Sequence, residues 1–378
     1  MRMPTLARAG WCSFFALLLI GVRAQAAPVF VQTNLVSDIA NFALLQDRNL
    51  RNPWGMSFSP TSPIWISDQM TNLATLYRVT NGVPVLQGLQ VAIPQTAGGP
   101  QGPTGQVFNS TTAFHVGASP ANFIFADLNG TISAWNNTAG TTAVIEATTP
   151  GAVYTGLALA NGALGPALYA ANGPANRIDV FDGNFQLMSL PGAFSDPNVP
   201  AGFAPFNVQN LGGSIFVTYA PAGRPNQISA ALGQGVVAMF DTAGNFQREV
   251  VTGGELAAPW GLAIAPAGFD GFGGDLLVGN FSFLHSEINI FDLATGGLLD
   301  TIPIATGPNA PGGLWALAFG NGASGDRNTL FFTDGINGEA NGLFASISAV
   351  PEPGTVALLV AALALLVVRT HRPRLRFA

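Results

Sequence analysis

The segment that decides the fold runs from Ala258 to Ile302 and reads APWGLAIAPAGFDGFGGDLLVGNFSFLHSEINIFDLATGGLLDTI. It contains four short apolar runs: Ala258–Ala265, Asp275–Asn280, Glu287–Asp292 and Leu298–Ile302. Glycine-rich or polar residues typical of turns separate each run from the next. The segment therefore predicts four short consecutive β-strands.

The same order of parts recurs along the chain. Segments that correspond to the opening at Trp260 begin near residues 54, 104, 155, 206, 260 and 315, a spacing of roughly 50 to 55 residues. Such a period with four strands per repeat is typical of β-propeller blades. A pair of packed sheets, the alternative for an all-β chain, does not account for the sixfold spacing. We therefore predict an all-β, six-bladed β-propeller over residues 27–349.

The last repeat ends with its third apolar run, Leu343–Ala349. Another apolar run, Phe30–Val36, precedes the first repeat. We expect these two runs to pair in one sheet, because joining the first and last segments closes the ring and removes its open edge.

The run Arg177–Gly183, preceded by Leu168–Asn172, resembles NHL-type and gluconolactonase-like six-bladed propellers. The resemblance covers most of the body and implies the scaffold. Gluconolactonase-like propellers hold a divalent metal near the channel mouth, but with a glutamate that we cannot match in this sequence. A propeller scaffold carries many functions, so the resemblance alone gives no activity.

The composition excludes some partners and sites. Residues 27–350 contain 7 arginines and 19 acidic residues, a formal charge of −12, and the chain contains no lysine. An acidic body repels phosphate backbones, so we expect no nucleic acid partner. The only cysteine, Cys12, lies in the predicted signal peptide, which excludes disulfides and cysteine metal sites in the mature body.

The N-terminus has the three parts of a secretory signal peptide. Arg2 and Arg8 precede the apolar stretch Trp11–Val22, and Ala24-Gln25-Ala26 provides small residues for cleavage. We predict a signal peptide over residues 1–26. An N-terminal membrane anchor is the alternative.

The C-terminus resembles a PEP-CTERM sorting signal of Gram-negative bacteria. Pro351-Glu352-Pro353 precedes the apolar run Val356–Val368 and a tail with four arginines. Thirteen helical residues span only about 20 Å, which is short for a hydrocarbon core of about 30 Å. The resemblance, over residues 350–378, implies a transient stay in the inner membrane and cleavage by an exosortase. The protein then reaches the cell surface or the exopolysaccharide matrix. A plain C-terminal anchor is the alternative.

Polar and aromatic residues recur where the repeats meet the predicted channel mouth. The second strands of five repeats end at Asp68, Asp127, Asn172, Asn280 and Asp334, and three first strands begin at Trp54, Trp260 and Trp315. The side-chain oxygens of these Asp and Asn residues could bind Ca²⁺ or another divalent cation, and Asp68, Asp127 and Asp334 are the candidate metal ligands. The tryptophans could bind a sugar. The alternative is that Asp and Asn only stabilise turns.

Signals for catalysis are few. His115 and His285 are the only histidines between residues 27 and 350, so a centre with several histidines is excluded. The sequence contains neither a Gly-x-Ser-x-Gly nor a His-Glu-x-x-His motif. Two insertions interrupt the repeats: Ala220–Gln234, with Arg224, should reach over the channel mouth, and Ala267–Gly274, with Asp270, should lie on the opposite face.

Three functions fit these features. The first is an exported, non-enzymatic binding scaffold at the surface or in the matrix, with a monomeric body and exopolysaccharide or surface proteins as partners. The second is a metal-dependent hydrolase or lactonase with its site at the channel mouth. The third is a purely structural matrix component.

Overall fold

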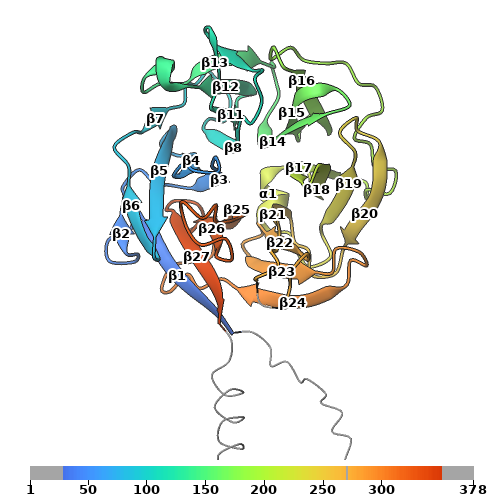
Figure 1. The fold of residues 1–378 in the computed structure, drawn as a ribbon. Coiled ribbons are helices and arrows are strands. Elements are labelled where there is room, and N and C mark those ends of the chain that lie inside the picture. The colour runs from blue at the N-terminus through green and yellow to red at the C-terminus, as the bar shows by residue number, and fades with distance from the viewer. Residues whose placement is uncertain (1–28, 270, 351–378) are drawn as a thin grey trace, which may run out of the picture. The chain divides into compact units, whose positions relative to one another are not determined.

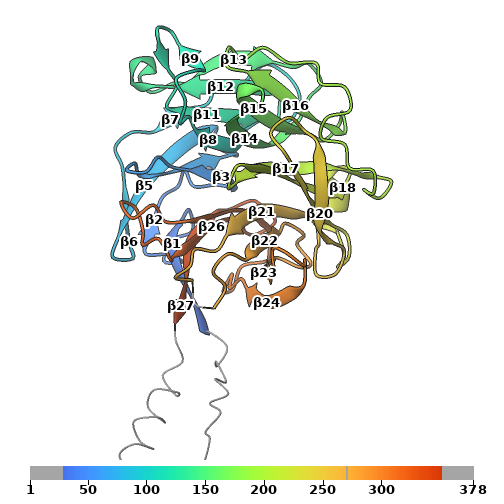
Figure 2. The same cartoon turned by 45° about the vertical axis from the view of Figure 1, so that its right-hand side comes forward.

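The structure, a computed structural model, describes residues 29–350 except residue 270. Six sheets, antiparallel except for one parallel strand pair in the last, follow one another around a common centre, and the first strand of each sheet lies nearest to this centre (Figure 1). Figure 2 shows the same succession of sheets from a second direction. The described body is therefore a six-bladed β-propeller, which confirms the predicted fold.

The first three blades follow the chain from Pro53. Blade 1 contains β3 (Pro53–Ser57), β4 (Ile64–Asp68), β5 (Leu73–Thr80) and β6 (Val83–Leu86), and β7 (Val91–Ala92) also pairs with β5. Blade 2 contains β8 (Pro103–Phe108), β11 (Phe123–Asp127), β12 (Thr131–Trp135) and β13 (Val144–Thr148). Its loops add the hairpin of β9 (His115–Val116) and β10 (Ser119–Pro120) and the 3-10 helix η1 (Asn137–Ala139). Blade 3 contains three strands, β14 (Tyr154–Gly162), β15 (Gly165–Asn172) and β16 (Arg177–Asp182).

The last three blades complete the ring. Blade 4 contains β17 (Phe203–Leu211), β18 (Ser214–Pro221), β19 (Val236–Phe240) and β20 (Phe246–Thr252), with helix α1 (Arg224–Ile228) between β18 and β19. Blade 5 contains β21 (Pro259–Ile264), β22 (Leu276–Asn280), β23 (Glu287–Phe291) and β24 (Leu298–Pro303). Blade 6 contains β25 (Gly313–Phe319), β26 (Leu330–Gly335), β27 (Leu343–Val350), β1 (Val29–Ser37) and β2 (Leu45–Gln46).

Blade 6 closes the ring with strands from both ends of the described body. β1 pairs antiparallel with β27, from Val29 opposite Val350 to Ser37 opposite Leu343. The register shifts once, between Asn34 and Val36. The predicted pairing of Phe30–Val36 with Leu343–Ala349 is therefore confirmed.

The hydrophobic core lies between neighbouring blades. In β15, Tyr169 belongs to a cluster shared with blade 4, whereas Leu168 and Ala170 belong to a cluster shared with blade 2. Successive side chains of a strand point to opposite faces of its sheet, and here both faces are covered. This arrangement explains why the strands read as apolar runs instead of alternating with polar residues.

Glycines allow the first strands of neighbouring blades to approach closely. Gly55, Gly105, Gly156 and Gly261 follow the opening residue of their repeats. A Cβ atom on Gly105 would lie 2.3 Å from the backbone nitrogen of Leu157 in blade 3. A Cβ atom on Gly261 would lie 2.3 Å from the carbonyl oxygen of Trp315 in blade 6. These positions therefore require glycine because the neighbouring backbone fills the space of a side chain.

The membrane-targeting predictions fall on other parts of the chain. Within residues 29–350, no helix is long and apolar enough to cross a membrane. The predicted signal peptide, the motif Pro351-Glu352-Pro353 and the predicted sorting helix lie outside the described residues, as does Asp270.

Candidate functional site at the channel mouth

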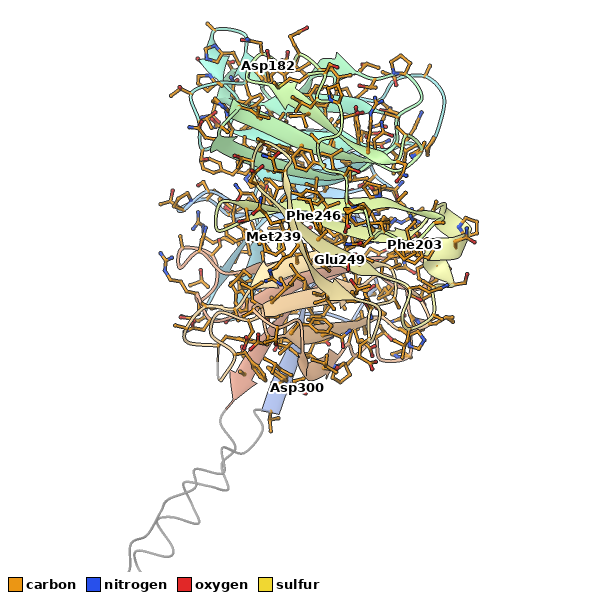
Figure 3. All side chains as sticks on the ribbon, turned by 90° about the vertical axis from the view of Figure 1, so that its right-hand side faces the viewer. Asp182, Phe203, Met239, Phe246, Glu249 and Asp300 are labelled. Atoms are coloured by element: carbon orange, nitrogen blue, oxygen red, sulfur yellow. The ribbon has the colours of Figure 1, made fainter. Side chains whose placement is uncertain are left out.

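The channel-mouth cavity lies where the first strands begin and has a volume of about 760 Å³. Its lining residues come from several blades and include Trp54, Leu128, Thr155, Phe203, Arg224 and Glu339. Phe203, at the start of β17, lies toward one face of the ring in Figure 3, whereas Met239, Phe246 and Glu249 lie on the outer strands of the same blade. Most of the exposed lining surface is apolar. A cavity of this size and character is typical of small-molecule sites.

An aromatic cluster, which we call the aromatic floor, adjoins the cavity and contributes Trp54 to its lining. The rings of Trp54 and Trp315 stack with centroids 3.5 Å apart, and Trp260 meets Trp315 edge to face at 5.5 Å. Phe206 and Phe281 complete the cluster. The structure therefore brings the three predicted tryptophans together, but all three are buried, and their faces cover one another.

One indole N–H in this floor has no acceptor. Trp315 Nε1 donates to Asn52 Oδ1 at 3.0 Å, and Trp260 Nε1 donates to the carbonyl oxygen of Thr155 at 2.9 Å. Trp54 Nε1 is buried and has no hydrogen-bond partner among the described residues. An unpaired buried donor costs about 1–3 kcal/mol, so Trp54 gains free energy from any ligand oxygen that reaches it.

Arg224 lies over this aromatic floor. It begins helix α1, which appears near the centre of the ring in Figure 1, and its guanidinium carbon lies 4.4 Å from the ring centroid of Phe281 and 5.5 Å from that of Trp315. Burial lowers the pKa of Arg224 to about 10, so the side chain stays charged at neutral pH. The insertion 220–234 therefore reaches over the channel mouth, as predicted.

Glu339, from blade 6, forms an ion pair with this arginine of blade 4. Its Oε2 contacts Nη2 of Arg224, which links α1 of blade 4 to the turn between β26 and β27 of blade 6. Nη1 of Arg224 and Oε1 of Glu339 are buried without a hydrogen-bond partner among the described residues. These two atoms and Trp54 Nε1 belong to residues that line the cavity, but the atoms themselves have almost no exposed surface.

Two of the three acidic residues predicted at the mouth, Asp68 and Asp127, form hydrogen bonds within the propeller wall instead. Asp68 accepts a hydrogen bond from Thr75 at 2.7 Å, and Asp127 accepts one from Gln95 at 2.6 Å. Their strands explain this placement. Asp68 shares the face of Ile64 and Ile66, which pack between blades 1 and 6, because residues two apart point the same way.

The two predicted amide side chains, Asn172 and Asn280, also form hydrogen bonds within the propeller wall. Asn172 donates to Asp179 Oδ2 at 2.7 Å. Asn280 accepts from the backbone N–H of Ala257 at 2.9 Å and donates to the carbonyl oxygen of Glu255 at 2.7 Å. Both side chains are buried. Their hydrogen bonds join them to the strands and turns that surround them.

The three metal candidates do not form a coordination site. Residues 29–350, as far as they are described, contain no group of three or more His, Cys, Asp or Glu side chains that could hold a metal ion. Asp68, Asp127 and Asp334 also do not line the channel-mouth cavity. The donor set that Ca²⁺ or another divalent cation would need is therefore not assembled from these carboxylates.

Asp334 is a buried carboxyl group without a partner. Neither of its oxygens has a hydrogen bond to any described residue, and the side chain is fully buried on β26. Burial raises the pKa of Asp334 from 3.8 to about 7. Burial also raises the pKa of Asp68, and of Asp127 less strongly. The stability of the folded propeller should therefore depend on whether these buried carboxyl groups are protonated.

The two histidines lie away from the cavity. His115 is exposed on β9, and its Nε2 lies 2.9 Å from the carbonyl oxygen of Thr112. His285 belongs to the turn before β23 and does not line the cavity. The sequence did not predict a role for Glu339, because the turn between β26 and β27 has no residue pattern that recurs in the other repeats.

The chain has similar sequences among known proteins, but these relatives are uncharacterised. No protein-family model matches the chain. Two uncharacterised proteins of Acanthamoeba polyphaga mimivirus are 30% and 29% identical to it in alignments of 273 residues that cover 68% of this chain. The chain spans 66% of the length of the first relative and 70% of that of the second.

Solved propellers resemble the body at low sequence identity. A streptogramin B lyase matches 85% of this chain and 98% of its own, with a TM-score of 0.50 and 12% identity. A gluconolactonase from Xanthomonas campestris matches 62% of this chain and 73% of its own, with a TM-score of 0.41 and 19% identity. At 12% identity, the likeness to the streptogramin B lyase concerns the fold alone.

Proposed function

We propose that the protein is an exported, non-enzymatic propeller that binds a small molecule in the channel-mouth cavity. The observation that carries this proposal is the cavity itself. It joins a mostly apolar wall to a few polar side chains, namely Asn176, Gln227, Arg224 and Glu339. Few polar groups in an otherwise apolar hollow fix the orientation of a ligand and provide its specificity.

A screen of small ring-containing compounds by ligand-observed NMR tests the proposal. Gln227 lines the cavity from α1 and is only partly exposed, so Gln227→Trp places a large ring in the hollow. Compounds that bind the unaltered protein should lose binding to this variant. Hits whose binding is unchanged by Gln227→Trp would show that the ligand site lies elsewhere.

A hydrolase or lactonase remains the second candidate. It rests on the same cavity and on the resemblance to gluconolactonase-like propellers. The described residues supply no metal-binding cluster for it, and neither histidine lines the cavity. Metal analysis of the purified protein tests this candidate: one equivalent of a divalent ion that is lost with Glu339→Gln, a change in the lining of the cavity, would favour the enzyme.

The cellular location that we propose for the protein depends on the sequences at its two ends. We propose that the signal peptide directs export and that Pro351-Glu352-Pro353 directs an exosortase to release the body to the surface or matrix. Changing these three residues to alanine in a native host should leave the protein uncut in the inner membrane, because a sorting enzyme reads the motif and a simple anchor does not. Processing of the alanine variant at the normal rate would favour a plain anchor or another protease.

A further inference from the structure

Blade 3 has three strands, whereas each of the other blades has at least four strands among the described residues. Its third strand, β16, is therefore its outermost strand (Figure 1). We propose that the outer edge of β16 binds an extended peptide segment of a partner protein, in which an acidic residue stands next to an apolar residue. This inference goes beyond the proposed function, because no residue that lines the groove beside β16 lines the channel-mouth cavity.

The sequence of blade 4 indicates where the fourth strand of blade 3 is lost. Gly183–Gln186 reads GNFQ, as does Gly244–Gln247 of blade 4. In blade 4 this motif leads into β20, which pairs with every residue of β19. In blade 3 the chain after the motif forms one isolated bridge with β16, Phe181 opposite Leu187. It then reaches Pro191, which has no N–H to donate to a ladder. The first half of β16 is therefore left without an outer neighbour.

This open edge presents backbone groups for one more strand. The N–H of Met188 donates to the carbonyl oxygen of Val180 at 2.8 Å, so the backbone groups of Val180 point away from β15. In an antiparallel sheet alternate residues direct both groups to the same edge, and those of Ile178 therefore also point outward. Within the part of the chain that the structure describes, no backbone group bonds Ile178 N–H, Ile178 C=O or Val180 N–H on this side. An extended peptide can pair with these three groups.

A groove of about 380 Å³ lies along the open edge. One wall is β16 from Arg177 to Val180, and the other is the chain from Leu187 to Ala193. A backbone hydrogen bond contributes only about 0.5–1.5 kcal/mol, which does not offset the entropy lost on binding unless apolar contacts are added. The groove offers such contacts, because Met188 and Leu190 line it and are only partly buried.

Arg177 determines the charge of the segment that fits the groove. Its Nε donates to Asp179 Oδ1 at 2.5 Å, and its two Nη nitrogens have no hydrogen bond to any described residue. Asp179 is buried and also accepts hydrogen bonds from Tyr154 and Asn172. Of the two charged side chains that line the groove, only Arg177 is therefore exposed. A carboxylate of the bound segment can accept from the free Nη nitrogens.

The pleat of the strand places the acidic residue beside an apolar residue. Ile178 belongs to the core cluster between blades 3 and 4, against which Met188 and Leu190 also pack. Neighbouring residues of a strand point to opposite faces, so Arg177 points to the other face. An added strand follows the same alternation. The residue of the segment that reaches Arg177 therefore stands next to one that contacts Met188 or Leu190.

Hydrogen exchange on the full protein body tests the pairing directly. The probe is the acetylated and amidated peptide Thr-Val-Glu-Val-Thr, which we call the glutamate peptide. At about four times its Kd, the amides of Ile178 and Val180 should exchange about fivefold more slowly, because only the free protein leaves them open. The amides of β15 should not change, since they lie behind β16. Unchanged exchange at Ile178 and Val180 with the peptide in excess would overturn the proposal.

Matched peptides and variants test the ladder and the charge by fluorescence anisotropy. A glutamate peptide methylated on its central backbone nitrogens should not bind, because it cannot donate to the edge. Replacing its glutamate by lysine should weaken binding about threefold, as expected of an exposed ion pair. Arg177→Gln should remove this difference, and Arg48→Gln, at an exposed arginine outside the groove, should keep it. Equal binding of the methylated peptide, or a difference that survives Arg177→Gln, contradicts the proposed partner.

Two further results concern the place and the occupant. Ser189→Trp puts a ring on an exposed position of the groove wall and should abolish binding, whereas Ser119→Trp, exposed on β10, should not. Unchanged binding to Ser189→Trp would place the peptide elsewhere. If exchange at Ile178 slows with rising protein concentration and no peptide, a second copy of the chain fills the edge, and the partner that we propose is wrong.

Discussion

Asp334 should make the stability of the propeller depend on pH in an unusual direction. Its side chain is fully buried, both oxygens lack a described partner, and burial raises its pKa from 3.8 to about 7. Between these two values the folded protein binds the proton and the unfolded chain does not. The contribution of Asp334 to stability is therefore complete below about pH 4 and is lost as the pH rises to about 7.

The size of the effect follows from the two pKa values. One pKa unit corresponds to about 1.4 kcal/mol, so the full difference between 3.8 and about 7 amounts to about 4 kcal/mol. Between pH 5 and pH 8 the loss is about 2.5 kcal/mol. Asp334→Asn keeps the shape of the protonated acid and cannot ionise. Its free energy of unfolding, relative to that of the unaltered protein, should rise by about 2.5 kcal/mol over the same interval.

Urea unfolding at pH 5, 6, 7 and 8 measures this difference. Asp68 and Asp127 also have raised pKa values, but they are present in both proteins, so the comparison isolates Asp334. Asp300→Asn, on the outer strand β24, is the matched control and should show no such trend. If the difference between Asp334→Asn and the unaltered protein is the same at pH 5 and pH 8, the carboxyl group does not titrate in this range and our description of its surroundings is wrong.

Two further predictions concern the ring. Gly105→Ala should lower the free energy of unfolding by about 3 kcal/mol in urea unfolding, because the added Cβ would overlap the backbone of Leu157. Gly88→Ala, where nothing lies within 4 Å and the backbone is relaxed, should change it by less than about 0.5 kcal/mol, and equal effects would contradict the close contact. Deleting residues 29–37 removes β1, which should expose the edge of β27 and cause aggregation in size-exclusion chromatography. A monomeric deletion protein with an unchanged melting temperature would show that β1 is not needed for closure.

The sequence predicted the fold well because its signals are local and repeated. Six openings at a regular spacing, each followed by apolar runs and turns, are sufficient to define six blades. The closing pair was also predictable, since the last repeat lacked a strand and the run Phe30–Val36 was available. Each of these inferences depends on spacing along the chain and not on where a side chain points.

The candidate site was harder to predict because it depends on side-chain direction. Asp68 ends its strand close to the mouth, but the pleat turns it to the face of Ile66 between two blades. The position of Arg224 followed from the length of its insertion. The pairing of Arg224 with Glu339 did not, because the two residues come from different blades and meet only once the ring has closed.

The closing ladder also determines how the body would carry force. Val29 and Val350 are partners in the register of β1 and β27, so the two ends of the described body lie side by side. A pull on both ends in one direction would load this antiparallel ladder as a single unit, whereas pulling them apart would open its hydrogen bonds one after another from that end. The first strands, held by backbone contacts around the glycines, lie outside this load path. Under tension, blade 6 should therefore yield first, while the five blades formed by β3 to β24 stay folded.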